Sequence, residues 1–297
     1  MQHTLSRARA LTLLAAAPLA ASCGSGSAGV KVGSKNFTEE LILGEIYAQR
    51  LEQTGQQVTH KLNLGTTDIA MAALRRNEID LYPEYTGTAL LNVLHLPPIS
   101  DPARSFDTVK SAYQKQFGLV WLKPSPFNDT QAMATTQKAA GYYALGRLSD
   151  LAANANELRL GAVPEFLTRA DGLPGLQKKY GGFRFKQTKI VDNGLKYQAL
   201  EHGDVDVIIA FSTEGQLKAD SLVVLEDDKR FFPVYNVAPV VRKAALDANS
   251  AIAGPLNKLA PLLTNDVMQD LNLQVDGPQK REPADVARDF LKSNGLA

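Results

Sequence analysis

The sequence has little of the residue types from which metal centres and covalent catalysts are built. Cysteine occurs once, as Cys23, so no disulfide can form within the chain. There is no G-x-S-x-G elbow and no P-loop, and the one G-x-G-x-x-G match, at 24–29, precedes a strand pattern instead of following one. The histidines are scattered without the spacing of metal ligands: His3, His60, His95 and His202. We therefore predict no metal, no cofactor and no enzymatic activity.

The chain also lacks an excess of charge of either sign. It has 32 Lys and Arg against 31 Asp and Glu, and removal of a leader that contains Arg7 and Arg9 changes the net charge from +1 to −1. A nucleic-acid binder would need a basic face, so nucleic acid is not an expected partner. The composition, 44% hydrophobic and 21% charged, is ordinary for a globular protein, and 297 residues suggest about two domains.

Residues 1–22 have the features of a secretory leader. Arg7 and Arg9 are its basic part, residues 10–17 are apolar, and Ala20-Ala21-Ser22 supplies small residues for cleavage. The apolar run is too short to be a good membrane-spanning helix. Cys23 follows directly and resembles the acylated cysteine of a bacterial lipoprotein, with residues 23–29 as a lipid-anchor tether; a buried lone cysteine is the alternative. We expect an exported protein, in a periplasm or on the outer face of the cell membrane.

The stretch from Val30 to Leu91 alternates between strand and helix patterns. Residues 30–32, 58–64 and 79–82 read as strands, with amphipathic helices between them. Asn36 stands three residues before Glu39, a pattern that predicts Asn36 as the cap of the first helix. Strands that alternate with helices form a parallel sheet, and ligands bind at the carboxyl ends of its strands. Polar segments follow the strands and mark a site at that edge: 34–36, 65–67 and 82–88.

A second α/β unit is predicted between about 135 and 232, with strands at 158–162, 183–191 and 205–211. The proline-rich segment 123–129 leads into it and 232–237 leads out, and each proline biases its predecessor away from helix. The tail, 244–297, has the pattern of two or three amphipathic helices that close the first unit.

Three segments carry a resemblance to a known family: GSKNFTEELILGE, GTTDIAMAALRRNEIDLYPEYTGTAL and PFNDTQAMA. They resemble the glycine betaine/choline-binding proteins of osmoprotectant ABC transporters. The resemblance implies an α/β fold of the type II periplasmic-binding-protein class. Each of its two lobes is a mostly parallel sheet flanked by helices, and two hinge crossovers join them. It places lobe I at 30–131 and 235–297 and lobe II at 132–234, and such lobes close on a ligand by hinge motion.

The family's ligands explain the residues that the resemblance assigns to the site. A quaternary ammonium has no N–H to donate, so aromatic faces hold it, and the carboxylate of a betaine needs fixed donors. The resemblance makes Tyr85 and Tyr235 walls of the cage and Thr88 a contact. Asp129 would face the cation. Arg169 would meet the ligand's carboxylate, which its planar fork suits better than a lysine would, and Lys35 would meet either that carboxylate or the other lobe.

Two departures from the family pattern affect the ligand prediction. Gln131 stands where many relatives have tyrosine, which removes an aromatic face and adds an amide that needs hydrogen-bond partners. Phe211 and Ser212, also expected to contact the ligand, stand at a strand end where Tyr-Thr is usual; Phe211 keeps the aromatic face and loses a hydroxyl. Losing one wall would weaken trimethylammonium binding by about 0.5–2 kcal/mol.

At most of these positions a purely structural role is the alternative: a tyrosine packed on the sheet rim, an aspartate in a turn, or an exposed lysine or arginine. At the level of function, the expected role is that of an ABC importer's substrate-binding subunit, a monomer that delivers a quaternary amine to a membrane permease. The same module could bind another small zwitterion, such as carnitine, choline, proline betaine or an amino acid. An enzyme on the same scaffold and a sensory ectodomain are the rivals from other classes.

Overall fold

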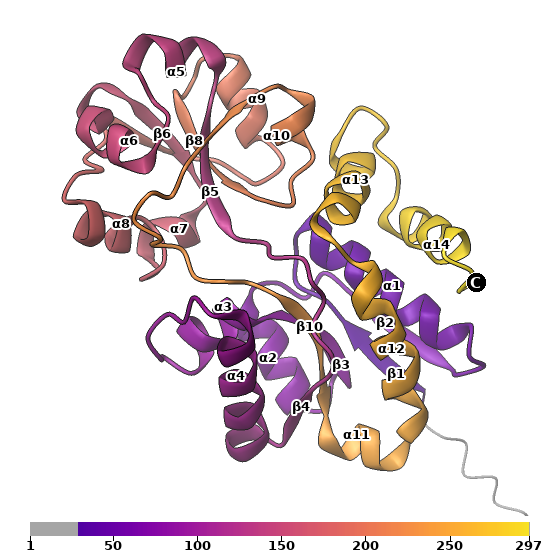
Figure 1. Ribbon diagram of the computed structural model, residues 1–297. Helices are drawn as coiled ribbons and strands as arrows, with labels where there is room; N and C mark the ends of the chain where they lie inside the picture. Colours follow the sequence, from indigo (N-terminus) through magenta and orange to yellow (C-terminus); the bar gives the residue numbers. More distant parts are fainter. Residues whose placement is uncertain (1–28, 297) are drawn as a thin grey trace, which may run out of the picture.

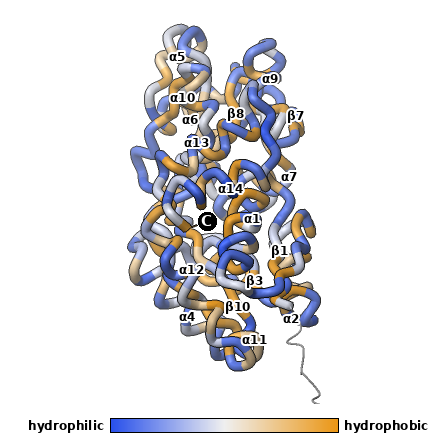
Figure 2. Tube along the Cα trace, turned by 90° about the vertical axis from the view of Figure 1, so that its right-hand side faces the viewer, coloured by the Kyte–Doolittle hydropathy of each residue, from blue (hydrophilic) through white to orange (hydrophobic). Residues whose placement is uncertain are grey.

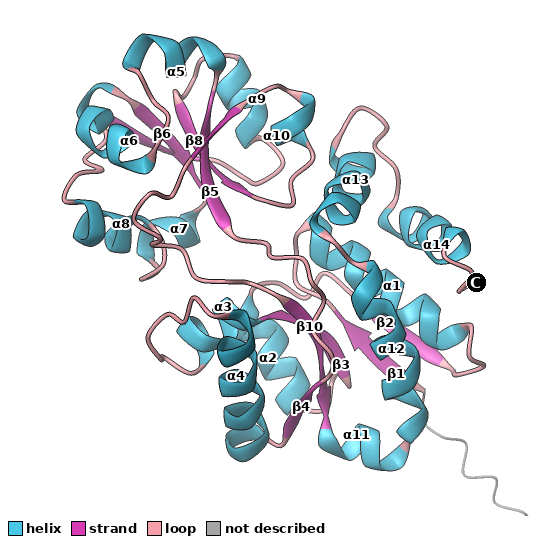
Figure 3. Cartoon of the chain, viewed as in Figure 1, coloured by secondary structure: helices cyan, strands magenta, loops and turns pink. Residues whose placement is uncertain are grey.

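The computed structural model describes residues 29–296. The predicted leader, the predicted anchor Cys23 and all but the last residue of the tether lie outside the described residues. Two lobes are present, each built on a five-stranded sheet with helices on both faces (Figures 1 and 3). The prediction of a two-lobed α/β fold is confirmed.

Lobe I is formed from two separate parts of the chain, and its sheet has the order β2-β1-β3-β10-β4. The first part contains β1 (Val30–Gly33), α1 (Thr38–Glu52), β2 (Val58–Lys61), α2 (Thr67–Arg75), β3 (Leu81–Tyr85), α3 (Thr86–Thr88), the π-helical η1 (Ala89–Val93), α4 (Pro102–Phe117) and β4 (Leu119–Trp121). The second part contains β10 (Val237–Arg242), α11 (Lys243–Ala248), η3 (Ser250–Ile252), α12 (Ala253–Leu259), η4 (Ala260–Leu262), α13 (Asn265–Asp276) and α14 (Pro283–Ser293).

Lobe II lies between these parts in the sequence, and its sheet has the order β7-β6-β8-β5-β9. It contains β5 (Gln131–Thr135), α5 (Gln137–Tyr143), α6 (Leu148–Asn154), η2 (Ala155–Glu157), β6 (Arg159–Ala162), α7 (Pro164–Thr168), α8 (Leu173–Tyr180), β7 (Gln187–Ile190), α9 (Lys196–Glu201), β8 (Val207–Phe211), α10 (Gln216–Ala219) and β9 (Val223–Leu225).

Both sheets are mostly parallel, and the antiparallel strand of each is the one next to a crossover. In lobe I, β1 pairs in parallel with β2 and β3, whereas β10 runs antiparallel to β3 and β4. In lobe II, β6 pairs in parallel with β7 and β8, whereas β5 runs antiparallel to β8 and β9. The chain therefore enters each of these strands directly from the other lobe.

The two crossovers lie side by side between the lobes (Figure 1). Asn128 and Asn236 form an antiparallel bridge, and the side chain of Asn236 donates to the carbonyl of Phe127 at 2.8 Å. The side chain of Asn128 accepts from the backbone N–H of Tyr235 at 2.6 Å. These bonds hold Asp129 and Tyr235, both predicted site residues, next to each other at the hinge.

The alternation of side chains along the strands divides lobe I into two cores. Leu81, Tyr85 and Val237 pack on the face covered by α1 and the tail helices. Tyr82 and Trp121 pack on the opposite face, with α2 and α4. Tyr85 thus emerges at the carboxyl end of β3, whereas Tyr82 and Trp121 are core residues, as expected from their places within strands.

Two local predictions need correction. Asn36 does not cap the first helix: the N-cap is Phe37, Asn36 is exposed, and the Glu40 carboxylate instead accepts the backbone N–H of Lys35 at 2.9 Å. The predicted strand at 183–191 shrinks to β7, an exposed edge strand, because Phe183 adopts a left-handed conformation (φ 60°) and is buried in the lobe II core.

Hydrophobic and hydrophilic positions are interspersed along the trace of both lobes (Figure 2). Among residues 29–296, no helix is both long enough and apolar enough to cross a membrane.

Candidate functional site

Most of the predicted site residues meet between the lobes. They and the polar residues bonded to them form what we call the interlobe cluster: Lys35, Glu39, Glu84, Tyr85, Asp129, Gln131, Arg169, Asp171 and Tyr235. Every member except Arg169 and Glu84 is buried with between 3% and 9% of its surface exposed; Glu84 is fully buried, and the Arg169 side chain is 25% exposed. A polar set of this size, removed from water, must satisfy its charges internally or with a ligand.

Lys35 lies at the start of the cluster, at the carboxyl end of β1. Its ammonium is 2.8 Å from Glu84 and 3.5 Å from Glu40, and it lies over the ring of Tyr85, 4.7 Å from the centroid. Burial disfavours the charged form, but the two carboxyl groups outweigh it and raise the pKa of Lys35. Burial raises the pKa of Glu40 to about 8, and Glu84 is the nearer of the two carboxyl groups to the ammonium. Lys35 is therefore buried and already ion-paired, not an exposed lysine.

Tyr85 connects Lys35 to a chain of hydrogen bonds that crosses between the lobes. Its hydroxyl donates to Glu39 at 2.7 Å. The amide of Asn272, on α13, donates to the other oxygen of Glu39 at 2.9 Å and to the backbone carbonyl of Thr213 at 3.0 Å. Thr213, which follows β8 in lobe II, donates its hydroxyl to Asp129 at 2.7 Å.

Glu39 and Asp129 are the unusual members of this chain. In the described part of the protein neither carboxyl is ion-paired with a lysine or an arginine, whereas Lys35, Arg169 and Lys196 each have a carboxylate partner. Burial, then the Glu39 charge, raises the pKa of Asp129 well above its ordinary value, and burial raises that of Glu39. Both oxygens of Glu39 are hydrogen-bonded, but only one oxygen of Asp129 is. The free oxygen of Asp129 is the atom that a cation could reach.

Arg169 and its neighbours form the other half of the cluster. Arg169 ends α7 and forks onto Asp171, with Nε at 2.8 Å from Oδ1 and Nη2 bonded to Oδ2. Gln131, at the start of β5, donates to the same Oδ2 at 2.9 Å and to the hydroxyl of Tyr235 at 3.1 Å. Tyr235 in turn donates to Asp171. The amide nitrogen of Gln131, the residue that replaces a predicted aromatic wall, is thus bonded to protein partners.

The ring of Tyr235 fits its place because residue 87 is glycine. A Cβ built on Gly87 would lie 2.5 Å from Cδ1 of Tyr235 and 2.7 Å from the carbonyl of Val234. Thr88, one residue further on, is 6% exposed, and its hydroxyl makes no hydrogen bond within the described chain. It is thus available to a ligand.

Phe211 is the last residue of β8, and Ser212 follows it. Neither side chain is hydrogen-bonded to Arg169 or Asp171 among the described residues. The Lys196 ammonium lies 4.8 Å from the Phe211 centroid and 2.6 Å from Glu214. The Ser212 hydroxyl donates to the backbone carbonyl of Asn128 at 2.6 Å. Ser212 therefore ties lobe II to the crossover, and its role as a ligand contact stays a prediction.

Sequence reasoning missed several members of this network, among them Glu39, Asp171 and Asn272. The sequence pattern marks Glu39 only as a partner in a helix cap, although it lies a few residues after the end of the first strand. Asp171 follows Arg169 by two residues, a spacing at which a short turn can bring the two side chains together. Asn272 lies within an amphipathic helix, and nothing in its neighbourhood marks it as different from other polar residues of the tail.

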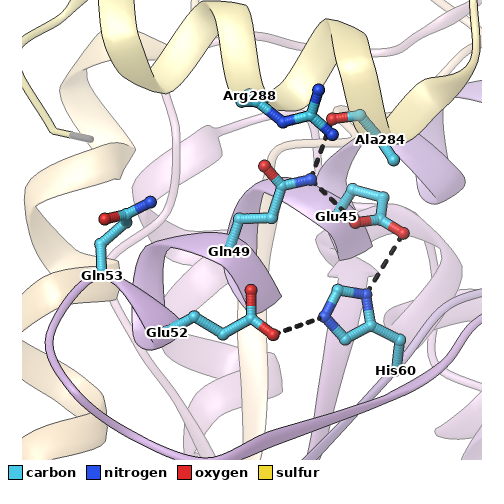
Figure 4. A pocket seen from close by; sticks show the side chains of 7 residues that line it. All are labelled: Glu45, Gln49, Glu52, Gln53, His60, Ala284 and Arg288. Atoms are coloured by element: carbon cyan, nitrogen blue, oxygen red, sulfur yellow. Dashed lines mark hydrogen bonds and ion pairs between the residues drawn. The ribbon is translucent and has the colours of Figure 1, made fainter.

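A hollow lies on the outside of lobe I, between α1, β2 and α14 (Figure 4). Its volume is about 390 Å³, and all of its lining residues except Ala284 have polar or charged side chains. His60 lies between two carboxylates, with Nδ1 3.3 Å from Glu45 and Nε2 3.1 Å from Glu52. Within residues 29–296 no group of three or more His, Cys, Asp or Glu side chains is arranged to hold a metal ion.

Comparison with known proteins identifies a family and several relatives. Residues 28–293 match the family described as the substrate-binding domain of ABC-type glycine betaine transport systems. The chain is 38% identical over 277 residues to a glycine-betaine-binding protein of Pseudomonas aeruginosa. The alignment covers 90% of this chain and 88% of that protein. The chain is also 36% identical over 266 residues to an ergothioneine transport permease/ergothioneine-binding protein of Helicobacter pylori, covering 89% of this chain and 47% of that longer protein.

The fold has a matching solved structure. A crystal structure of a glycine betaine/carnitine/choline ABC transporter protein is 32% identical and superposes with a TM-score of 0.76, covering 90% of this chain and 99% of that one.

Proposed function

Because the chain belongs to the family of substrate-binding domains of ABC-type glycine betaine transport systems, we propose that it captures glycine betaine or a related quaternary amine between its lobes. It then delivers the ligand to an ABC permease in the membrane. The proposal assigns no catalytic step to the protein.

One observation carries the ligand class: the interlobe cluster contains two buried carboxyl groups, Glu39 and Asp129, that have no cationic partner among the described residues. A buried acid without a partner is costly, so such groups are retained where a ligand completes them. Tyr85 and Tyr235 offer aromatic faces, which hold a cation that cannot donate a hydrogen bond. We assign Asp129 to the cation, with Tyr85, Tyr235 and Phe211 around it.

The polar end of the ligand would lie toward Thr88, Gln131 and Arg169. The Thr88 hydroxyl has no partner in the described chain, so it can bond to a ligand without breaking an existing bond. Lys35 contributes indirectly, because its ammonium lies on Tyr85 and neutralises Glu84. We place the lobe boundaries at 131/132, next to the first residue of β5, and at 234/235, shortly before β10.

We also propose that the protein is exported through its leader and anchored through Cys23. A palmitate-labelling experiment tests the anchor, since a Cys23→Ser variant should lose the label and leave the membrane fraction. Retention of the variant in that fraction would refute the anchor without bearing on the ligand.

A thermal-shift panel tests the function. Glycine betaine, choline, carnitine, ergothioneine and L-proline are added to the mature protein; a ligand at 100 times its Kd stabilises by about 2.7 kcal/mol, or about 5–10 °C in Tm. We expect shifts with quaternary amines and none with L-proline. Tyr85→Ala and Tyr235→Ala should weaken binding more than Tyr82→Ala, because Tyr82 packs in the core and reaches the cluster only through its hydroxyl, which donates to Glu84 at 2.7 Å. A shift with an ordinary amino acid and none with any quaternary amine would refute the proposal.

A further inference from the structure

Asp171 occupies the position at which the resemblance places the carboxylate of a ligand. It is 3% exposed and lies in the short turn between α7 and α8. Its Oδ1 accepts from Nε of Arg169, and its Oδ2 accepts from Nη2 of Arg169, from Gln131 and from Tyr235. Three side chains assigned to the ligand therefore converge on a carboxylate of the protein itself.

The turn that presents Asp171 is fixed by its backbone. Gly172 donates its N–H to the carbonyl of Arg169 at 3.0 Å. A Cβ at Gly172 would lie 2.1 Å from the carbonyl oxygen of Phe166, so no other residue fits there without a backbone shift. The carboxylate is thus built into the lobe next to the guanidinium, and a free ligand's carboxylate would have to compete with an intramolecular one.

Among the described residues, the other cations in and beside the cluster are already paired and are not spare for such a ligand. Lys35 is paired with Glu84 at 2.8 Å, and Lys196 with Glu214 at 2.6 Å. The two carboxyl groups without a cationic partner, Glu39 and Asp129, offer no positive charge, and a cation bound beside them favours their ionised form. A carboxylate brought into this dry space would meet uncompensated acids and an arginine that is already neutralised, whereas a hydroxyl would not be repelled.

We propose that Asp171 is a specificity-determining residue. It occupies the fork of Arg169, so that the cleft takes a quaternary ammonium with a neutral, hydroxyl-bearing end, such as choline, in preference to the carboxylate-ended zwitterion. This inference rests on the proposed function, because it concerns the choice among quaternary amines at the same site.

The test is the ratio of two dissociation constants, Kd of glycine betaine over Kd of choline, measured by isothermal titration calorimetry on the mature protein. In the wild type the ratio should exceed one. Asp171→Asn keeps the shape and frees the guanidinium, so the ratio should fall about tenfold or more through tighter betaine binding, as one added charge-assisted hydrogen bond implies. A ratio that stays the same or rises overturns the inference.

Asp206→Asn is the matched control. Asp206 forms the same kind of fork with Arg159, at 2.9 Å and 2.7 Å, at the amino-terminal ends of β6 and β8. This variant also loses a bidentate ion pair of lobe II, but the ratio should remain that of the wild type. If it changes the ratio as much as Asp171→Asn does, the effect belongs to the stability of the lobe, and the inference fails.

A second variant keeps the inference testable if Asp171→Asn does not fold. Arg169→Gln/Asp171→Asn removes the pair without changing the net charge, and the ratio should stay within about threefold of the wild type. A selective tenfold loss of betaine binding would mean that Arg169 binds the ligand's carboxylate in the wild type, which overturns the inference alone. If the wild type binds no quaternary amine at all, the proposed function falls, and this inference with it.

Discussion

Replacing Asp129 with asparagine separates charge from shape at the centre of the cluster. The Thr213 hydroxyl can still donate to Oδ1, as it does at 2.7 Å in the wild type, and the new amide nitrogen replaces the oxygen that makes no hydrogen bond within the described chain. The substitution therefore removes one ionisable group and leaves the packing of the hinge in place.

The loss of affinity follows from Coulomb's law. A carboxylate about 4–6 Å from a trimethylammonium centre contributes about 3–4 kcal/mol at an effective dielectric constant of 20. Part of this attraction offsets the free energy needed to ionise Asp129, because burial and the Glu39 charge raise its pKa. A net loss of about 1–3 kcal/mol remains, so Asp129→Asn should bind choline roughly 5- to 150-fold more weakly.

The unliganded protein should respond in the opposite direction. Since the folded-state pKa of Asp129 is raised, its carboxyl costs no stability below the unfolded pKa of about 3.9, and stability is lost as the pH rises toward the folded value. An asparagine cannot ionise and avoids this loss. Asp129→Asn should therefore have a higher Tm than the wild type at neutral pH, and the difference should grow with pH.

Calorimetric titration with choline between about pH 5 and 8 measures the loss of affinity, and thermal unfolding of the free protein over the same range measures the change in Tm. Wild-type affinity should increase with pH, because the cation favours ionised Asp129, and the slope should decrease in the variant. Glu39, Glu214 and Lys196 also face this carboxyl, so some slope should persist.

Asp276→Asn is the control, because burial also raises the pKa of Asp276, yet its carboxylate bonds to Thr38 outside the cluster. Unchanged choline affinity in Asp129→Asn, or an equal loss in Asp276→Asn, would refute the reasoning.

Three further predictions concern single contacts. Gly87→Ala should push Tyr235 from its place, at a cost of about 1–3 kcal/mol in stability, and weaken ligand binding; a wild-type Kd would contradict this. Lys35→Met leaves Glu84 buried without its partner and should lower the free energy of unfolding in urea by about 3–5 kcal/mol. Burial disfavours the His60 cation, but its two carboxylate partners raise the pKa of His60, so its stabilisation is present below pH about 6.5 and lost as pH rises through the raised value. The Tm difference between wild type and His60→Gln should therefore shrink with increasing pH, and a constant difference would contradict it.

The fold could be predicted from the sequence because its elements follow from local patterns. The apolar run predicted as a strand at 205–211 contains β8, and the strand predicted at 79–82 overlaps β3; both are buried along almost their whole length. Patterns failed where a tertiary contact decides. Asn36 does not cap the helix; the Glu40 carboxylate instead accepts the backbone N–H of Lys35, just before the helix. Residue spacing alone does not distinguish these two arrangements.

The site was predictable by position and less so by chemistry. Tyr85 and Asp129 follow strand ends or crossovers, so topology alone brings them toward one place. Which charges are already neutralised is a property of pairs distant in sequence, such as Lys35 with Glu84, and of short turns such as the one that brings Asp171 to Arg169. The sequence shows the charged residues but not their partners, and the partners decide what ligand is accepted.

Asn272 shows how capture of a ligand and closure of the lobes can be one event. Its single amide nitrogen donates both to Glu39 of lobe I and to the carbonyl of Thr213 in lobe II. Thr213 holds Asp129, and Glu39 holds Tyr85, so the two groups we assign to the cation are positioned through the same amide. Opening the lobes must break at least one of the two Asn272 bonds. A cation between Tyr85 and Asp129 favours the ionised forms of Glu39, which accepts from Asn272, and of Asp129, which accepts from Thr213. The tail helix α13 therefore belongs to the ligand-binding hinge as much as to the core it covers.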